Sequence, residues 1–146
     1  MDRRQRRRSR IQGAAGVRGK RGIVMAEFNS VEELGLCILH IGINTKNAEE
    51  ARAIAEQFHT WMGFTPDEGE GSIFASSLVE VMKFEGPGTM GHIAIGAHDV
   101  DKAAEYFRST GMGVKEETAL YTEDGTMKFI YLGKEIAGFA IHLKQY

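Results

Sequence analysis

Two stretches of the chain repeat each other around a histidine, and this repeat constrains the fold more than any other feature. Residues 39–43 read LHIGI and residues 91–95 read GHIAI. In both copies a residue suited to capping a helix lies seven positions after the histidine, Asn47 in the first and Asp99 in the second. A repeat with a period of about fifty residues predicts two copies of one supersecondary unit. A histidine at the same point of both copies predicts a site that the two copies share.

The first copy predicts a strand, a helix and two further strands. Residues 36–43 suit a buried strand, and Asn47 with Glu50 forms a capping-box pattern. Gly63 is a typical helix stop, and two strands are expected around a Ser-Ser turn at 76–77. The helix has one apolar face at spacings of three and four; its members are Ala51, Ile54, Ala55, Phe58, Trp61 and Met62.

The second copy repeats this order. A strand around residues 93–95 precedes a helix capped by Asp99, which Gly111 and Gly113 are expected to end. Residues 114–117, 127–132 and 139–144 read as strands, with a hairpin-turn signal at Asp124-Gly125. The whole chain therefore predicts an α+β fold of two tandem β-α-β-β-β modules, whose curved mixed sheets enclose a shared cleft.

The net charge of −2 hides a strong asymmetry along the 146 residues. Residues 1–24 contain nine Lys or Arg and one Asp, a balance of +8, which leaves −10 for the rest. We predict a disordered basic leader or tail over 1–24, and one domain over 25–146 with modules at about 36–85 and 90–144. For residues 1–24 the sequence leaves open a translated leader before a natural start at Met25, a transit peptide, or a nucleic-acid-binding arm.

Composition removes several function classes. An acidic domain argues against nucleic-acid binding, and no apolar run approaches the length of a membrane span. The single cysteine, Cys37, excludes an intrachain disulfide and suits a reducing compartment, so we expect a cytoplasmic protein. Cys37 itself is interpreted as a core residue and not as a nucleophile.

Strand alternation places three histidines on faces cleared by small residues. His40 shares its face with Gly42, and Leu39, Ile41 and Ile43 are expected on the other face. His92 shares its face with Ala94 and Gly96, and His142 shares its face with Ala140 and Gly138. A packed core does not normally leave small residues around each imidazole, whereas a cavity does.

Aligning the two modules end to end adds a carboxylate, because Glu80 then matches His142. The predicted metal ligands are therefore His40, Glu80, His92 and His142. Imidazole and carboxylate ligands suit Zn, Ni, Fe, Mn or Co, and the lack of thiolate argues against a structural zinc knot. The alternative is structural, with hydrogen-bonded strand histidines and a solvent-facing Glu80. His59 and His98 are interpreted as surface residues.

These residues resemble the vicinal oxygen chelate superfamily, which includes glyoxalase I, extradiol dioxygenases, methylmalonyl-CoA epimerase and bleomycin-resistance proteins. The resemblance covers residues 36–144 and rests on the paired modules and on the twice-seen His-x₆-Asn/Asp element. It implies a metal between the modules, held at His40, Glu80, His92 and His142. The usual glyoxalase pattern has glutamate at the last position, so His142 argues against glyoxalase I activity.

A narrower similarity concerns the segments LHIGIN, VEVMK, GHIAIG and AGFAIHL. They are similar to a glyoxalase-like extension of some bacterial ketohydroxyglutarate/ketodeoxyphosphogluconate aldolases. The aldolase barrel and its Schiff-base lysine do not fit within a chain of 146 residues. An aldolase activity is therefore not expected of this chain itself.

Three functions follow as hypotheses. The first is a metal-dependent lyase or isomerase acting on a small, anionic α-keto or α-hydroxy acid or a similar substrate with vicinal oxygens, with Glu80 as catalytic base. The second is an Fe(II) dioxygenase, in which His40, His92 and Glu80 form the facial triad. The third is a metal-free module that sequesters or senses a ligand, as bleomycin-resistance proteins do, or that only dimerises. The superfamily resemblance implies a homodimer.

Overall fold

The computed structural model describes residues 31–146, and the predicted leader at 1–24 lies outside the described residues. The described part contains a short 3-10 helix, two α-helices and eight strands. In chain order these are η1 (Val31–Leu34), β1 (Cys37–Ile43), α1 (Ala48–Met62), β2 (Asp67–Glu68), β3 (Ser72–Ser76), β4 (Val79–Met82), β5 (Gly91–Ala97), α2 (Val100–Arg108), β6 (Val114–Tyr121), β7 (Met127–Leu132) and β8 (Phe139–Gln145).

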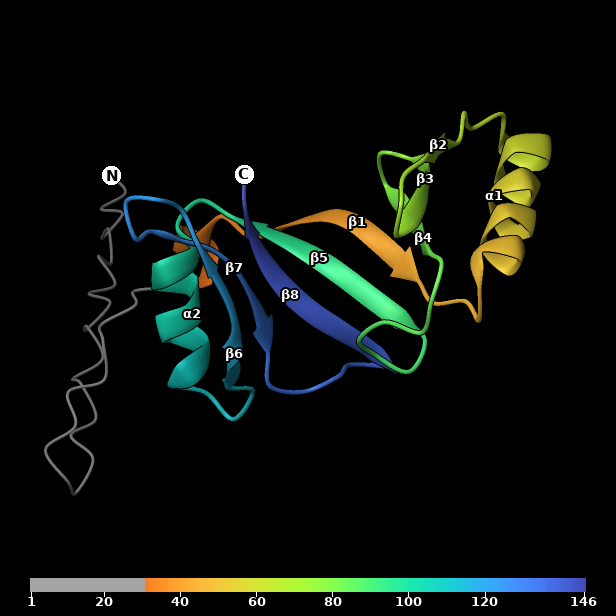
Figure 1. Cartoon of the computed structure of the whole chain (residues 1–146). Helices are drawn as coiled ribbons and strands as arrows, with labels where there is room; N and C mark the ends of the chain where they lie inside the picture. Colours follow the sequence, from red (N-terminus) through yellow and green to blue (C-terminus); the bar gives the residue numbers. More distant parts are fainter. Residues whose placement is uncertain (1–30) are drawn as a thin grey trace, which may run out of the picture.

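The strands form one eight-stranded mixed sheet in the order β2-β3-β4-β1-β5-β8-β7-β6. In each module the first strand runs parallel to the last, β1 beside β4 and β5 beside β8. The two modules join within one chain, because β1 and β5 pair antiparallel at the centre of the sheet (Figure 1). The α+β fold of two β-α-β-β-β modules is therefore confirmed, with the two sheets continuous across β1 and β5.

Both helices begin where the sequence predicts. The Asn47 side chain accepts a hydrogen bond from the Glu50 backbone N–H, and the Asp99 side chain accepts one from Lys102. Gly63 ends α1 in the left-handed region at φ 70°. Helix α2 ends earlier than expected, at Arg108 with Ser109 as its cap.

Each module has its own core on the helix-bearing side of the sheet. Helix α1 packs on β3 and β4, and α2 packs on β7 and β8 (Figure 1). The first core consists of the buried residues Ala51, Ala55, Ile73, Ala75 and Val81. The second core is larger and also includes a residue of η1; its members are Leu34, Ala97, Val100, Ala103, Ala104, Met127, Ile130, Leu132, Ile141 and Leu143.

The predicted apolar face of α1 is only partly buried. Ala51 and Ala55 are buried against the sheet, with Ile54 and Phe58 packed beside them. The prediction is wrong at the end of the helix, where Trp61 is 81% exposed and Met62 is 61% exposed. Both residues lie in the last turn of α1, which the sheet leaves largely uncovered.

A side-chain clamp holds the connection between the modules. The Asn44 amide donates to the backbone carbonyls of Gly86 and Gly88, each at 2.9 Å. Its oxygen accepts from the Gly86 N–H at 3.2 Å. Gly88 has φ 88°, and a Cβ there would clash with the Gly91 carbonyl, so the tight turn requires glycine. This clamp ties the end of β1 to the start of β5.

Among residues 31–146, no helix has the length and apolar character needed to cross a membrane.

Candidate metal centre

The four predicted ligands lie on the inner face of the sheet, on its four central strands, in two adjacent rows. In the first row Glu80 of β4 pairs with Gly42 of β1, which pairs with His92 of β5. In the second row His40 pairs with Ala94, which pairs with His142 of β8. Large and small side chains therefore alternate across the strands. The predicted small-residue faces provide the space in which three imidazoles and a carboxylate converge.

Gly42 shows how closely this space is fitted. It lies between Glu80 and His92 in its row, and a Cβ on Gly42 would clash with the His92 imidazole. Its backbone lies outside the left-handed region. Glycine is therefore needed here for close approach and not for its backbone conformation.

A β-bulge changes the predicted alternation at the start of β1. Ile38 pairs with Ile95 and His40 with Ala94, so Leu39 is an extra residue between them. The expectation that Leu39 faces away from His40 is wrong, because Leu39 lines the same pocket as His40. Bulges redirect side chains in this way and are common beside functional sites.

Three of the four side chains meet at one point. His40 Nε2 lies 3.2 Å from Glu80 Oε2, and His92 Nε2 lies 3.1 Å from the same oxygen. The two Nε2 atoms are 3.1 Å apart. If both imidazoles donated to Glu80, their N–H groups would crowd against each other, because neither nitrogen could then accept from the other. The triangle suits three lone pairs directed at one cation better than it suits a hydrogen-bonded set.

His142 completes a group of three histidines that could hold a metal ion. One ligand atom each of His40, His92 and His142 lies within 4.8 Å of the others. His142 is 4% exposed, and its buried Nδ1 has no hydrogen-bond partner. Burial, with the neighbouring His92 and His40, lowers the pKa of His142 to about 3. The ring is therefore neutral at pH 7 and offers a lone pair, as a metal ligand must.

Glu80 is held as a carboxylate. The imidazoles of His40 and His92 hold the pKa of Glu80 well below its usual range, against the opposing effect of its burial. Its other oxygen, Oε1, accepts a hydrogen bond of 2.7 Å from Ser72 Oγ on β3. Such a partner fixes the orientation of a ligating carboxylate.

The donor spacing fits a divalent transition metal. Bonds of about 2.0–2.1 Å to nitrogen and oxygen place neighbouring ligands about 2.9 Å apart in an octahedron and about 3.4 Å apart in a tetrahedron. The observed spacings of 3.1–3.2 Å fall between these limits. Three imidazoles and one carboxylate, with no thiolate, suit Zn, Fe, Ni, Co or Mn. The residues present therefore fit such an ion, and its identity stays open.

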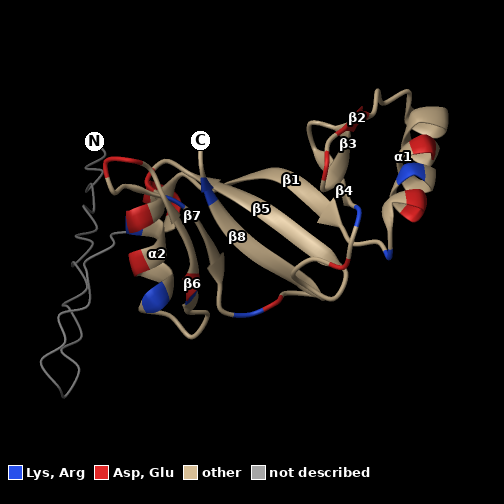
Figure 2. Ribbon diagram, viewed as in Figure 1, with Lys and Arg blue, Asp and Glu red and all other residues tan. Residues whose placement is uncertain are grey.

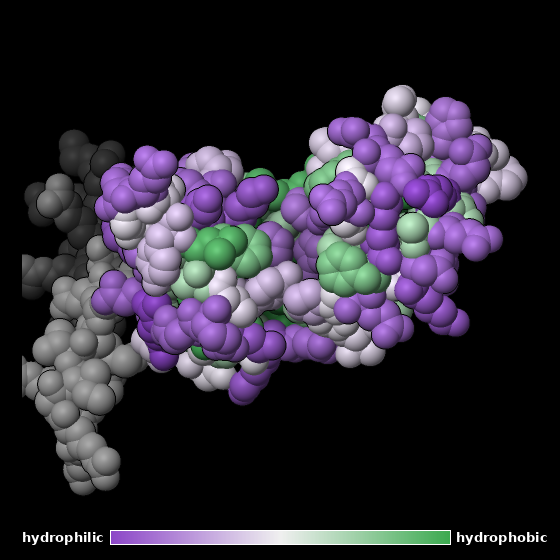
Figure 3. All heavy atoms as spheres, viewed as in Figure 1, coloured by the Kyte–Doolittle hydropathy of each residue, from purple (hydrophilic) through white to green (hydrophobic). Residues whose placement is uncertain are grey.

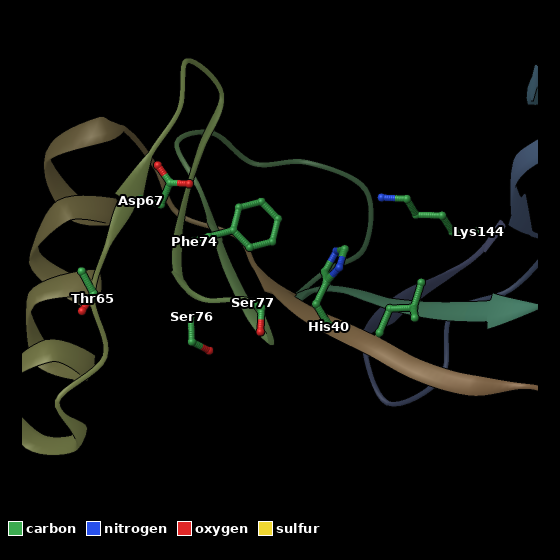
Figure 4. A pocket seen from close by; sticks show the side chains of 8 residues that line it. His40, Thr65, Asp67, Phe74, Ser76, Ser77 and Lys144 are labelled. Carbon is green, nitrogen blue, oxygen red and sulfur yellow. The ribbon is translucent and has the colours of Figure 1, made fainter. Parts of the chain in front are cut away.

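An open pocket of about 440 Å³ adjoins the histidine cluster, and His40 is the member of the predicted quartet that lines it (Figure 4). Phe74 contacts the His40 ring edge-on, with centroids 5.6 Å apart. Figure 3 shows a hollow between the part of the molecule around α1 and the part around α2, with hydrophobic residues beside it. The full lining is Leu39, His40, Thr65, Asp67, Phe74, Ser76, Ser77 and Lys144.

Two aromatic residues of β7 form the wall behind His142. The rings of Phe129 and Tyr131 lie 4.5 and 5.3 Å from that of His142. Burial, with the charge of Glu80, raises the pKa of the Tyr131 hydroxyl.

Several residues of the site were not predicted from the sequence: Leu39, Ser72, Phe129 and Lys144. Lys144 follows His142 by two positions on one strand face, and alternation alone could have identified it. Ser72 required the β3–β4 register, and Leu39 required the bulge. The predicted surface histidines, His59 and His98, are exposed and lie outside the cluster.

The resemblance of this chain to known proteins lies in its fold. No family model matches the sequence, and no curated protein does so. A methylmalonyl-CoA epimerase from Streptomyces coelicolor, a variant in complex with 2-nitronate-propionyl-CoA, matches with a TM-score of 0.51 and 20% identity over 75% of this chain and 93% of that chain. The epimerase from Mycobacterium tuberculosis matches with a TM-score of 0.50 and 18% identity, over 74% and 86% respectively.

A hypothetical protein from Bacillus halodurans C-125 matches with a TM-score of 0.53 and 14% identity, over 77% of this chain and 95% of that chain. The similarity to the aldolase extension stays a prediction. At these identities the likeness concerns the fold alone, and this chain shares its fold with the methylmalonyl-CoA epimerases and with the Bacillus halodurans protein.

Proposed function

We propose that the chain is a metal-dependent enzyme of the lyase or isomerase type, acting on a small substrate with two neighbouring oxygens. The observation that carries this proposal is the convergence of His40 Nε2, His92 Nε2 and Glu80 Oε2 within 3.2 Å of one another, beside the buried and unpartnered His142. His40, Glu80, His92 and His142 would hold the metal. α-Keto and α-hydroxy acids offer the required pair of oxygens.

A bound divalent metal would supply Lewis-acid stabilisation of the negative charge that develops on oxygen when a proton leaves the adjacent carbon. The chain provides the surroundings for this chemistry. One carboxylate among four ligands leaves a local charge of about +1 beside a divalent ion, which favours an anionic substrate. Phe74, Phe129 and Tyr131 limit water around the imidazoles.

Glu80 is the proposed base, because a carboxylate is the only conventional general base among the four residues. Its low pKa favours the ligand role while it contacts His40 and His92. Proton abstraction therefore requires Glu80 to move away from the two imidazoles. The hydrogen bond from Ser72 to Oε1 would hold the carboxylate close to the site during that movement.

The fold neighbours suggest a second substrate class for the same chemistry. Their names include a methylmalonyl-CoA epimerase in complex with methylmalonyl-CoA. Epimerisation of such a thioester also begins with loss of a proton beside a carbonyl. The open pocket would let a long acyl carrier extend into solvent. Methylmalonyl-CoA therefore belongs in the substrate panel beside the keto and hydroxy acids.

The test is proton exchange measured on the metal-loaded protein. We expect about one equivalent of divalent metal by elemental analysis, and deuterium incorporation from D₂O at the α-carbon of at least one panel member by NMR. Glu80→Gln keeps an oxygen ligand but removes the base, so it should retain metal and lose exchange. Glu85→Gln, in an exposed loop outside the site, serves as the matched control. Wild-type protein that binds no divalent metal would refute the proposal.

The Fe(II) dioxygenase alternative uses His40, His92 and Glu80 as a two-histidine, one-carboxylate triad. His142→Ala separates the two cases. A facial triad should keep its iron in this variant and gain an open coordination position. A four-ligand centre should lose much of its metal affinity. Oxygen consumption with an added catechol would favour the dioxygenase.

The metal-free binding module is the remaining alternative. Its signature is an unchanged ligand affinity in His40→Ala and His92→Ala, together with the absence of stoichiometric metal. The homodimer also stays a prediction, and sedimentation equilibrium tests it.

A further inference from the structure

Lys144 is the one Lys, Arg, Asp or Glu residue on the three adjacent strands β1, β5 and β8. Strands β1 and β5 contain no Lys, Arg, Asp or Glu, and β8 contains Lys144 alone. In Figure 2 the same three strands are tan, except for a blue segment near the C-terminal end of β8. Because Lys144 follows His142 by two positions, it lies on the same inner face of the sheet.

Within residues 31–146 the Lys144 ammonium has no hydrogen-bond or ion-pair partner. It lines the pocket with His40, and its side chain extends from β8 towards the side of the pocket where Phe74 lies (Figure 4). Within the described residues no carboxylate lies within ion-pair distance of it. Two other lysines serve as comparisons. Lys83 is paired with Glu68 at 2.8 Å. Lys128 lies on the opposite face of β7 from the site.

The far wall of the pocket has the opposite character. It consists of the hydroxyl groups of Thr65, Ser76 and Ser77 and the carboxylate of Asp67 (Figure 4). A negatively charged group is attracted to the Lys144 side and repelled from the Asp67 side. The pocket is therefore positively charged on the Lys144 side and negatively charged on the Asp67 side, and this difference orients any anion that enters.

We propose that Lys144 binds a carboxylate or phosphoryl group of the substrate and thereby directs the substrate's adjacent oxygens towards the His40 end of the pocket. This inference rests on the proposed function and names its specificity-determining residue. The volume of about 440 Å³ lies within the usual range for small-molecule sites. The substrate class is then a small molecule with two chelating oxygens and a separate anionic group.

The first experiment compares two chelators that differ by one anionic group. Acetohydroxamate and malonohydroxamate present the same pair of oxygens, and only the second carries a carboxylate. Calorimetry on the zinc-loaded protein should show malonohydroxamate binding about tenfold more tightly, the typical effect of one charge-assisted hydrogen bond. Lys144→Met should abolish this difference and leave acetohydroxamate within twofold. Lys144→Arg should restore most of it, and Lys128→Met should change neither ligand.

A second experiment separates the two proposals. Metal-free protein is titrated with malonate and with methyl phosphate, and chemical shifts of residues around the pocket are followed by NMR. Shifts that disappear in Lys144→Met support the anion subsite even if the protein binds no metal, in which case the proposed function alone fails. The anion that binds more tightly shows whether the subsite prefers a carboxylate or a phosphoryl group.

The proposal is overturned if Lys144→Met leaves the preference between the two hydroxamates unchanged in zinc-loaded protein. In protein that binds no zinc, it is overturned if neither anion produces shifts that depend on Lys144. Circular dichroism and thermal melts of each variant confirm that the comparison is made on folded protein. Because Lys144 is exposed, its replacement should leave the melting temperature nearly unchanged.

Discussion

The two modules share one order of elements but differ in how they bury their residues. The first module has a small core in which two alanines of α1 face three residues of β3 and β4. The second has a larger core to which η1 and three buried residues of α2 contribute. The difference continues into the site. The side chains of His40 and Glu80, from the first module, are 11% and 16% exposed, whereas His92 is only 5% exposed.

This difference indicates a division of roles between the modules. The second module buries His92 and His142, and the rings of Phe129 and Tyr131 pack against His142. The first module presents His40 at the pocket and places the Glu80 carboxylate against the imidazoles of His40 and His92. We therefore expect a ligand to approach over the first module and to meet the buried side chains of the second. Substitutions in each module test this difference in burial.

The largest expected effect concerns the proposed metal ligands. His92→Ala should lower zinc affinity about a thousandfold, about 4 kcal/mol, because it removes a central ligand that water reaches poorly. His40→Ala should lower it about a hundredfold, because water from the pocket can replace the lost ligand. Competition with a chromogenic chelator measures both values. Equal losses in the two variants would contradict the proposed asymmetry.

The next effect concerns the cores. Ile130 and Ile73 are both fully buried, the first in the large core and the second in the small one. Ile130→Ala should cost about 4 kcal/mol of unfolding free energy and Ile73→Ala about 3 kcal/mol, since the small core beside short strands relaxes more easily. Urea denaturation provides the measurement. A larger loss for Ile73→Ala would show that the first module is the better packed one.

A smaller effect is expected where the modules meet. Gly42→Ala places a methyl group against the His92 imidazole, which is buried and cannot swing away. We expect a loss of zinc affinity of about tenfold to fiftyfold, with little change in far-UV circular dichroism. Gly111→Ala is the matched control, because its added methyl group meets no atom and its backbone is ordinary. Unchanged zinc affinity in Gly42→Ala would remove close fitting as the reason for this glycine.

The smallest effect is expected on the exposed end of α1. Trp61→Ser removes a large side chain that is 81% exposed, so the unfolding free energy should change by less than about 0.5 kcal/mol. A loss of more than 1 kcal/mol would mean that Trp61 is covered in solution, for example by a second copy of the chain. Repeating the denaturation at two protein concentrations distinguishes that case, because only an oligomer shows a concentration-dependent midpoint.

Much of the fold could be predicted because its signals are local. The caps Asn47 and Asp99 and the turn at Asp124-Gly125 depend on a few neighbouring residues, and they appear where the sequence places them. The exposure of Trp61 could not be predicted in this way. Helical periodicity shows which residues share a face, but not how far the opposing sheet extends.

The site shows the same limit more clearly. Alternation along separate strands was enough to propose His40, His92 and His142, because each stands beside small residues on its own strand. Glu80 was proposed because the end-to-end alignment of the two modules matches it with His142. It failed at Leu39, where a bulge against β5 reverses one side chain. It also could not show that Ser72 reaches Glu80, since that contact depends on the pairing of β3 with β4.

The repeat in the sequence by itself determined the two modules and the four candidate ligands, because periodicity and small-residue faces are properties of single strands and helices. Only the tertiary structure decided that β1 and β5 join the modules within one chain, that Glu80, Gly42 and His92 share one row, and that Lys144 lines the same pocket as His40. The physical reason is that register and strand pairing are set by contacts between distant segments, which no local pattern records.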